Sequence, residues 1–269
     1  MSTAQVKNII LAILALLNAF LLVLVLADRV EERESRETAE SAIVSVFQRN
    51  GITISEDVEL TAETPAVVTV TRSQDTEYEL VERLLGSSSA EPLGGNIWFY
   101  SGKNGQAQFR GTGEYDVVVT GGISGSDTAK SAKKVMNRLG MELDDSLTLV
   151  SGSTVTVTAC WDGLPVYNAV TTFTFYGGEE AVASGTRVFD TVTSSSADGV
   201  MSSYNALIRF LELVETEGYV CSEITSLSAG YIMSVSVSGE STLDPVWHVA
   251  ADTVELYINA VTGRIETID

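Results

Sequence analysis

The sequence has one histidine and two cysteines among its 269 residues. The cysteines, Cys160 and Cys221, lie far apart without Cys-x-x-Cys spacing, and one histidine cannot complete a zinc site with them. We therefore expect neither a metal nor a cofactor. In an oxidising compartment, Cys160 and Cys221 could form a disulfide, and two buried free thiols are the alternative.

Basic residues are also scarce, with 16 Lys and Arg against 36 Asp and Glu, which gives a formal net charge of −20. Binding to a phosphate backbone requires a basic surface, so this balance argues against a nucleic-acid partner. The only basic cluster shares one predicted helix and comprises Lys130, Lys133, Lys134 and Arg138. We interpret it as a solvated helix face, with a docking patch as the alternative.

Recognisable catalytic patterns are missing as well. His248 is the only histidine, and no Gly-x-Ser-x-Gly segment accompanies it, so a Ser-His-Asp triad is disfavoured and His248 is expected to be a packed or surface residue. The acidic pairs Asp144–Asp145 and Glu179–Glu180 lie at predicted turns, where acidic residues are ordinary. No phosphate-binding glycine pattern or calcium loop occurs. We expect the protein not to be an enzyme.

One long hydrophobic run is present, from Asn8 to Ala27, and it contains no charged residue. Twenty helical residues at about 1.5 Å each span a hydrocarbon core of about 30 Å. A cleaved signal peptide is the alternative, but Asp28 and Arg29 follow directly and no small-x-small cleavage site is seen. We predict a single-pass signal anchor in the cell membrane, with residues 1–7 cytoplasmic and the C-terminal domain extracytoplasmic.

One face of this predicted membrane helix carries small residues and an amide, namely Ala12, Ala15, Asn18 and Ala19. Small residues let two helices approach closely, and Asn18 can hydrogen-bond across to a partner helix. We interpret the face as a contact with a partner helix. The alternative is that alanine is merely common and that Asn18 is tolerated there.

The remainder predicts an α+β protein. Residues 28–50 form a stalk helix that Gly51 ends, 51–125 an N-terminal α+β lobe, and 126–269 a C-terminal lobe. The C-terminal lobe contains two units in which a helix precedes an antiparallel meander. We expect helices on one face of the sheets.

Hydrophobic periodicity places the individual elements. Gly86–Gly95 is expected to be a loop, Asn104-Gly105 a hairpin turn with left-handed residues, and 120–126 a break between the lobes. The predicted helices cover 77–85, 127–139 and 203–217. The predicted strands cover 67–71, 96–100, 106–110, 114–120, 147–161, 165–176, 181–190, 223–238, 246–251 and 255–260.

Several short segments carry a resemblance. They are Lys7–Leu22 with its Leu-Asn-Ala-Phe-Leu core, Gly163–Asn168 (Gly-Leu-Pro-Val-Tyr-Asn), and Leu243–His248 followed by Tyr257–Gly263. Together they resemble the YycI-like (YycH/YycI) regulatory proteins of the essential cell-wall two-component system of Gram-positive bacteria. The last two segments are also similar to the ending of PepSY-type modules.

The resemblance implies an outward-facing domain without enzyme activity. It implies contact with a membrane sensor histidine kinase through the membrane helix and the extracellular surface, together with a paralogous YycH-like partner. A PepSY-like inhibitor or chaperone of a secreted peptidase or cell-wall hydrolase is the alternative function. An enzyme acting on cell-wall polymer is the third and least favoured hypothesis.

Overall fold

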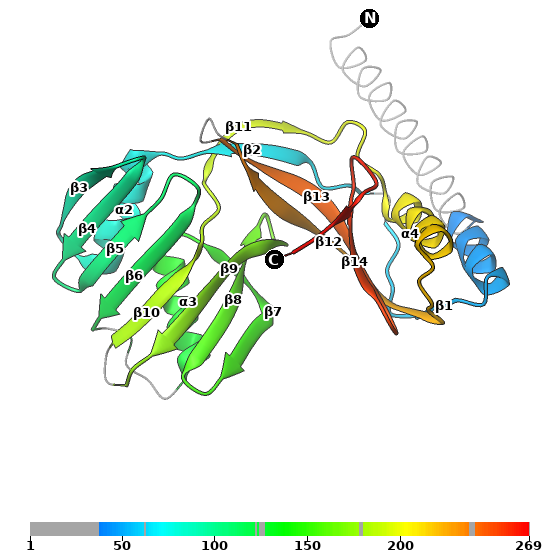
Figure 1. Ribbon diagram of the computed structural model, residues 1–269, viewed down its shortest axis with the longest axis horizontal. Coiled ribbons are helices and arrows are strands. Elements are labelled where there is room, and N and C mark those ends of the chain that lie inside the picture. The colour runs from blue at the N-terminus through cyan, green and yellow to red at the C-terminus, as the bar shows by residue number, and fades with distance from the viewer. Residues whose placement is uncertain are drawn as a thin grey trace, which may run out of the picture. The chain divides into compact units, whose positions relative to one another are not determined.

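The computed structural model describes residues 38–61, 63–121, 123, 127–177, 180–236 and 240–268 of a mixed α+β protein (Figure 1). It divides into two compact units, Met1–Ile54 and Ser55–Asp269. In the first unit, residues 38–49 form a helix, and the left-handed Gly51 (φ 76°) follows it, in agreement with the predicted end of the stalk. The predicted tail, membrane anchor and first part of the stalk helix lie outside the described residues. No helix within the described ranges is long and apolar enough to cross a membrane.

The second unit contains a helix-covered antiparallel sheet. Its strands, in spatial order, are β3 (Ser88–Gly94), β4 (Ile97–Gly102), β5 (Gly105–Phe109), β6 (Glu114–Thr120), β10 (Glu180–Thr186), β9 (Leu164–Phe175), β8 (Thr154–Trp161) and β7 (Glu142–Ser151). Helices α2 (Gln74–Leu85) and α3 (Thr128–Arg138) lie on one side of this sheet (Figure 1). None of the described helices lies on the opposite side of this sheet.

Local chemistry fixes where these two helices begin and which face they bury. The Ser73 side chain accepts a hydrogen bond from the Thr76 backbone N–H, and Asp127 accepts one from Lys130. The buried helical residues pack with alternate residues of the strands in one core, which includes Leu84, Leu85, Val135, Met136, Tyr115, Val117, Val155 and Phe173. Alternate side chains of the strands and the apolar faces of the helices, which repeat every 3.6 residues, therefore form one apolar layer.

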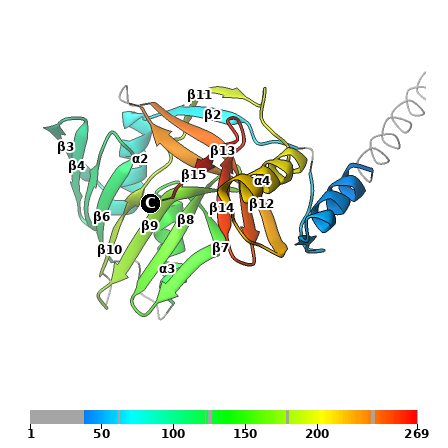
Figure 2. The ribbon, with the colours of Figure 1, turned by 45° about the vertical axis from the view of Figure 1, so that its right-hand side comes forward.

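A second sheet follows the order β11 (Thr191–Ser196), β2 (Val67–Thr71), β13 (Glu240–Ala251) and β12 (Glu223–Val235). The far half of β13 pairs with β14 (Glu255–Asn259), which pairs with β15 (Ile265–Glu266). Helix α4 (Ser203–Glu217) lies beside β13 and β14 (Figure 2). The buried Trp247 indole N–H donates to the Met201 carbonyl over 2.9 Å, and this bond fixes the start of α4 to the sheet.

The β11 strand differs from the others because all six of its side chains are exposed. Among the described strands it pairs only with β2. Backbone hydrogen bonds, rather than a buried side-chain face, therefore hold β11 in place.

Strand β9 joins the two sheets at its N-terminal end. Val166 forms a single parallel bridge with Tyr231 of β12. Next to it, the Asn168 side chain accepts a hydrogen bond from the Met233 N–H and donates one to the Met233 carbonyl, each over 2.8 Å. The side chain of Asn168 thereby takes the place of a strand's backbone groups and extends the ladder between the sheets.

A buried ion cluster lies where the chain passes from one sheet to the other. The Glu77 carboxylate receives two bonds from Arg72, at 2.6 and 2.8 Å, and a longer one from Arg187 at 3.4 Å. Tyr100 donates its hydroxyl hydrogen to Glu77 over 2.7 Å. The side chains of Glu77, Arg72 and Arg187 are only 1%, 6% and 3% exposed, so solvent does not screen these charges.

Burial disfavours the charge of Arg187 in the ion cluster, whereas Glu77 and two aromatic rings stabilise it. Burial lowers the pKa of the Arg187 guanidinium below its ordinary value, and the Glu77 charge acts in the opposite direction. The same guanidinium lies 5.3 Å from the ring centre of Phe109 and 5.6 Å from that of Phe189. These aromatic faces contribute a favourable contact with the cation in a site that excludes water.

The structure corrects several predicted elements. The Gly86–Gly95 segment is not a loop, because Ser88–Gly94 forms the edge strand β3. The predicted strand 147–161 is two strands, β7 and β8, separated by a turn at the left-handed Gly152 (φ 61°). The hairpin at residues 102–105 is present, but Asn104 is not left-handed; Gly105 has the positive φ, at 134°.

The helix faces also differ in detail from what helical periodicity predicts. Periodicity places Ala129 on the buried face of α3, but Ala129 is half-buried, whereas Ser131 is buried. Periodicity likewise places Ile208 on the buried face of α4, but Ile208 is 37% exposed, and Phe210 and Leu213 are buried instead. Strands from both sides of the predicted lobe boundary belong to one sheet, because β6 pairs with β10 from Thr120–Glu180 to Glu114–Thr186.

We predict that Glu77→Gln destabilises the protein by about 3–5 kcal/mol, because it leaves two buried guanidinium groups without a compensating charge. The measurement is urea unfolding of the full chain in a nonionic detergent. The control is Glu79→Gln, an exposed position on the same helix, which should change stability by less than about 0.5 kcal/mol. Equal stability of the two variants would contradict a stabilising role for the ion cluster.

We also predict that Gly230→Ala strains the joint between the sheets. A Cβ atom at Gly230 would lie 2.3 Å from the Tyr167 ring and 2.8 Å from the Pro165 carbonyl oxygen. Overpacking of this kind costs about 1–3 kcal/mol. Ser226→Ala, at an exposed position of β12, is the matched control in the same unfolding experiment, and a harmless Gly230→Ala would refute the close approach.

Candidate binding site

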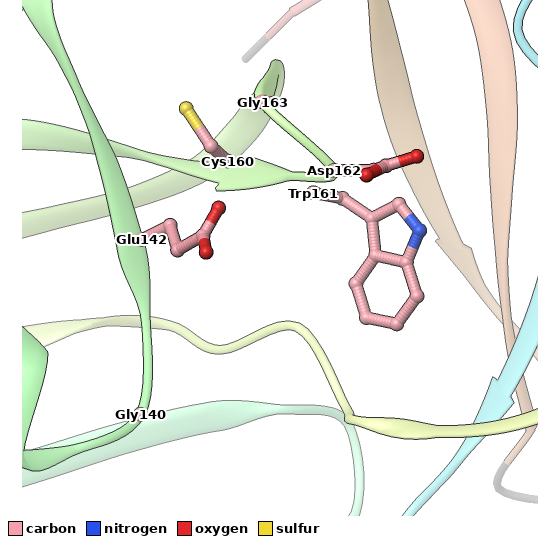
Figure 3. A pocket seen from close by; sticks show the side chains of 6 residues that line it. All are labelled: Gly140, Glu142, Cys160, Trp161, Asp162 and Gly163. Carbon is pink, nitrogen blue, oxygen red and sulfur yellow. The ribbon is translucent and has the colours of Figure 1, made fainter.

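The β8–β9 turn borders an open cavity of about 470 Å³. Its lining consists of Gly140, Glu142, Cys160, Trp161, Asp162 and Gly163. Figure 3 shows the Glu142 carboxylate and the Trp161 indole on two sides of the same space, with Asp162 beside the indole. The Cys160 thiol points away from the indole in this view. The cavity therefore presents one aromatic surface and two carboxylates.

Strand register and a tight turn bring these residues together. Glu142, at the start of β7, pairs with Cys160 near the end of β8. Asp162 (φ 51°) and Gly163 (φ 76°) are both left-handed, as a two-residue type I′ hairpin turn requires. Because the turn follows immediately, Trp161 stands at the very end of β8, where it is half-buried against the core of the second sheet.

The electrostatic potential around the cavity is negative. Burial, followed by the charges of Asp144, Glu142 and Asp145, raises the pKa of the Cys160 thiol to about 11. Asp145 is paired with Lys133 through contacts of 2.6 and 2.7 Å at the surface. Within the described part of the chain, Glu142 and Asp162 form no ion pair.

His248 belongs to an aromatic stack rather than to a catalytic group. Its ring lies 4.6 Å from Tyr257 at an interplanar angle of 15°, and 5.6 Å from Tyr167. Burial lowers the pKa of His248 below its ordinary value, while Glu255, whose Oε2 is 3.5 Å from Nε2, acts in the opposite direction. Of the two positions expected from the sequence, packed or surface, His248 takes the packed one.

The open face of the helix-covered sheet is a second candidate surface. It lies opposite the core residues because successive strand side chains point to opposite faces. One row of paired residues crosses it, comprising Phe99, Gln108, Asp116, Ser184, Thr172, Thr156 and Leu149. None of these side chains is fully buried, and most are small or polar. The open face is therefore an accessible, mostly polar surface.

The structure separates the residues that the sequence singled out. Ala12, Ala15, Asn18 and Ala19 lie outside the described residues. Cys160 is on β8, Cys221 is in the connection between α4 and β12, and both are free, half-buried cysteines. In the basic cluster, Lys130, Lys133 and Lys134 are exposed and Arg138 is half-buried.

The cavity was not predicted from the sequence. The one local signal of its position is the Asp162-Gly163 pair, because an Asp-Gly pair favours a tight hairpin turn, here directly after Trp161. Across the described ranges, no group of three or more His, Cys, Asp or Glu side chains is arranged to hold a metal ion.

Comparisons with known proteins return structural likeness only. The sequence matches no family model and no curated protein. Among solved structures, it is similar to an uncharacterized protein from Eubacterium rectale, with 14% identity, a TM-score of 0.43, and coverage of 81% of this chain and 90% of that chain. It is also similar to the C-terminal domain of YpeB from Bacillus megaterium, with 10% identity, a TM-score of 0.38, and coverage of 74% and 98%.

We predict that His248 titrates below its ordinary pKa of about 6.5. Because the folded-state pKa is depressed, the folding stability from a neutral His248 is complete above about pH 6.5 and is lost as the pH falls through the folded pKa. His248 is the only histidine, so its NMR titration is unambiguous.

The variant Glu255→Gln removes the opposing charge and should lower the His248 pKa further. Glu217→Gln, an exposed carboxylate on α4, provides the control. A His248 pKa at or above 6.5 in the folded protein would contradict this description of the stack.

Proposed function

We propose that the protein is a membrane-anchored extracytoplasmic regulator that binds and modulates a sensor histidine kinase controlling cell-wall metabolism. The observation that carries this proposal is the uncharged apolar run from Asn8 to Ala27 at the head of a strongly acidic α+β chain. In this proposal, the run is a single-pass anchor in the lipid bilayer and the C-terminal domain lies outside. A paralogous YycH-like regulator is a further proposed partner.

The segments that carry the family resemblance help to locate the proposed kinase contact. Asn168 bonds to β12, Tyr167 packs edge-to-face with Tyr257, and the Asn259 side chain accepts hydrogen bonds from the Val261 and Thr262 N–H groups. These residues maintain the fold, so their resemblance supports a related scaffold more than a shared contact surface. We therefore assign the kinase contact to the membrane-helix face of Ala12, Ala15, Asn18 and Ala19, and to the open face.

A regulator of this kind acts by contacting one signalling state of the kinase more strongly than the other. A partner that binds both states equally shifts nothing, however tightly it binds. A helix packed in the membrane and a domain outside it offer two places where the states of the kinase can differ. No catalytic group is required for this mechanism.

The test is affinity purification of the tagged full-length protein from crosslinked native membranes. We expect a sensor histidine kinase to co-purify, and its recovery to fall when residues 8–27 are replaced by an unrelated membrane helix or when Asn18→Leu removes the polar contact. Leu17→Ala, on the opposite side of the predicted helix, is the matched control. Recovery of the protein in the soluble fraction, or of membranes without any kinase attached, would overturn the proposal.

A second candidate function is inhibition or chaperoning of a secreted peptidase or cell-wall hydrolase, as in PepSY-like modules. Supporting it is the order of α4 followed by the antiparallel β12, β13 and β14, which closes in the turn Asn259–Gly263. This function predicts that the same purification yields such an enzyme, and that adding the full-length protein lowers the activity of that enzyme.

A further inference from the structure

We propose that the cavity at the β8–β9 turn binds the cationic side chain of an arginine or lysine from an extended segment of a partner protein. This site belongs to the acidic domain and shares no residue with the proposed membrane-helix contact. It does not depend on the partner being a kinase, so the two proposals can fail separately.

The aromatic surface is the first observation. Trp161 is half-buried against the second sheet, and its indole borders the cavity opposite Glu142 (Figure 3). Among aromatic side chains, tryptophan attracts a cation placed over its ring face most strongly. A guanidinium group in this space would lie between the indole and a carboxylate.

The second observation is the negative charge of the cavity lining, which favours a positively charged ligand. Glu142 and Asp162 line the cavity, and neither pairs with a cation in the ranges that the structure describes. Asp144 lies close enough to add to the negative potential at Cys160, and no basic residue lines the space. The negative charge of the described lining therefore disfavours an anionic ligand, whereas a charged donor such as guanidinium can satisfy the carboxylates.

Size and the adjacent strand edge favour a peptide over a bare ion. A volume of about 470 Å³ lies in the range of organic ligand sites and exceeds what one metal ion occupies. Glu142 begins β7, which among the described strands pairs only with β8. The Ser146 N–H and the Asp144 carbonyl are hydrogen-bonded within β7. Other backbone groups along its outer edge can hydrogen-bond to an extended segment while the basic side chain of that segment enters the cavity.

The test is fluorescence titration of the full-length protein, in a nonionic detergent, with a capped tripeptide that carries a central arginine. We expect saturable binding, and at least about tenfold weaker binding when citrulline, which is neutral and nearly isosteric, replaces the arginine. Trp161→Phe should remove the fluorescence change, which assigns the signal to this indole rather than to Trp98 or Trp247.

Glu142→Gln and Asp162→Asn should each weaken binding at least about fivefold. Both positions are exposed, and asparagine tolerates the left-handed backbone of residue 162, so the fold should be retained. Glu217→Gln is the control and should leave affinity unchanged. Equal binding of the citrulline peptide, unchanged affinity in both carboxylate variants, or equally tight binding of free arginine amide would overturn the proposal.

Discussion

A single buried carboxylate holds together the points where the chain leaves one sheet for the other. Glu77 is on α2, Arg72 follows β2 of the second sheet, and Arg187 follows β10 of the helix-covered sheet. Two separate crossings between the sheets are thus tied to one helix. The charges are tolerated because each is hydrogen-bonded or lies against an aromatic ring, since an unpaired charge at such depth would cost several kcal/mol.

The joint at β9 complements this cluster. There the sheets meet through one backbone bridge and the Asn168 side chain, while Gly230 lets the Tyr167 ring approach the backbone. The segment Gly163–Asn168 therefore serves two purposes. Its first residue forms the turn beside the cavity, and its last residue binds the other sheet. A site on this turn is held by both sheets, which gives it the rigid support that recognition needs.

Much of the fold follows from local sequence patterns. The bounds of β2, β6 and α4 agree with the prediction, because clear alternation or an amphipathic face ended by glycine marks each of them. Strand β3 escaped prediction because nearly all of its side chains are exposed, so no alternation appears. The ion cluster and the cavity could not be predicted, because Arg187 and Glu77 are 110 residues apart and only strand register brings Glu142 next to Trp161.

The exposed strand β11 has a consequence for local motion. With no side chain buried on either face, its removal from the sheet would cost only hydrogen bonds to β2, namely the backbone bonds and the one that the Thr193 hydroxyl donates to the Thr69 carbonyl. Such segments open at free energies well below that of global unfolding, and their amide hydrogens exchange first. Each opening would uncover the edge of β2, whose Val68 and Val70 side chains belong to the core, and would briefly turn an interior strand into an available pairing partner.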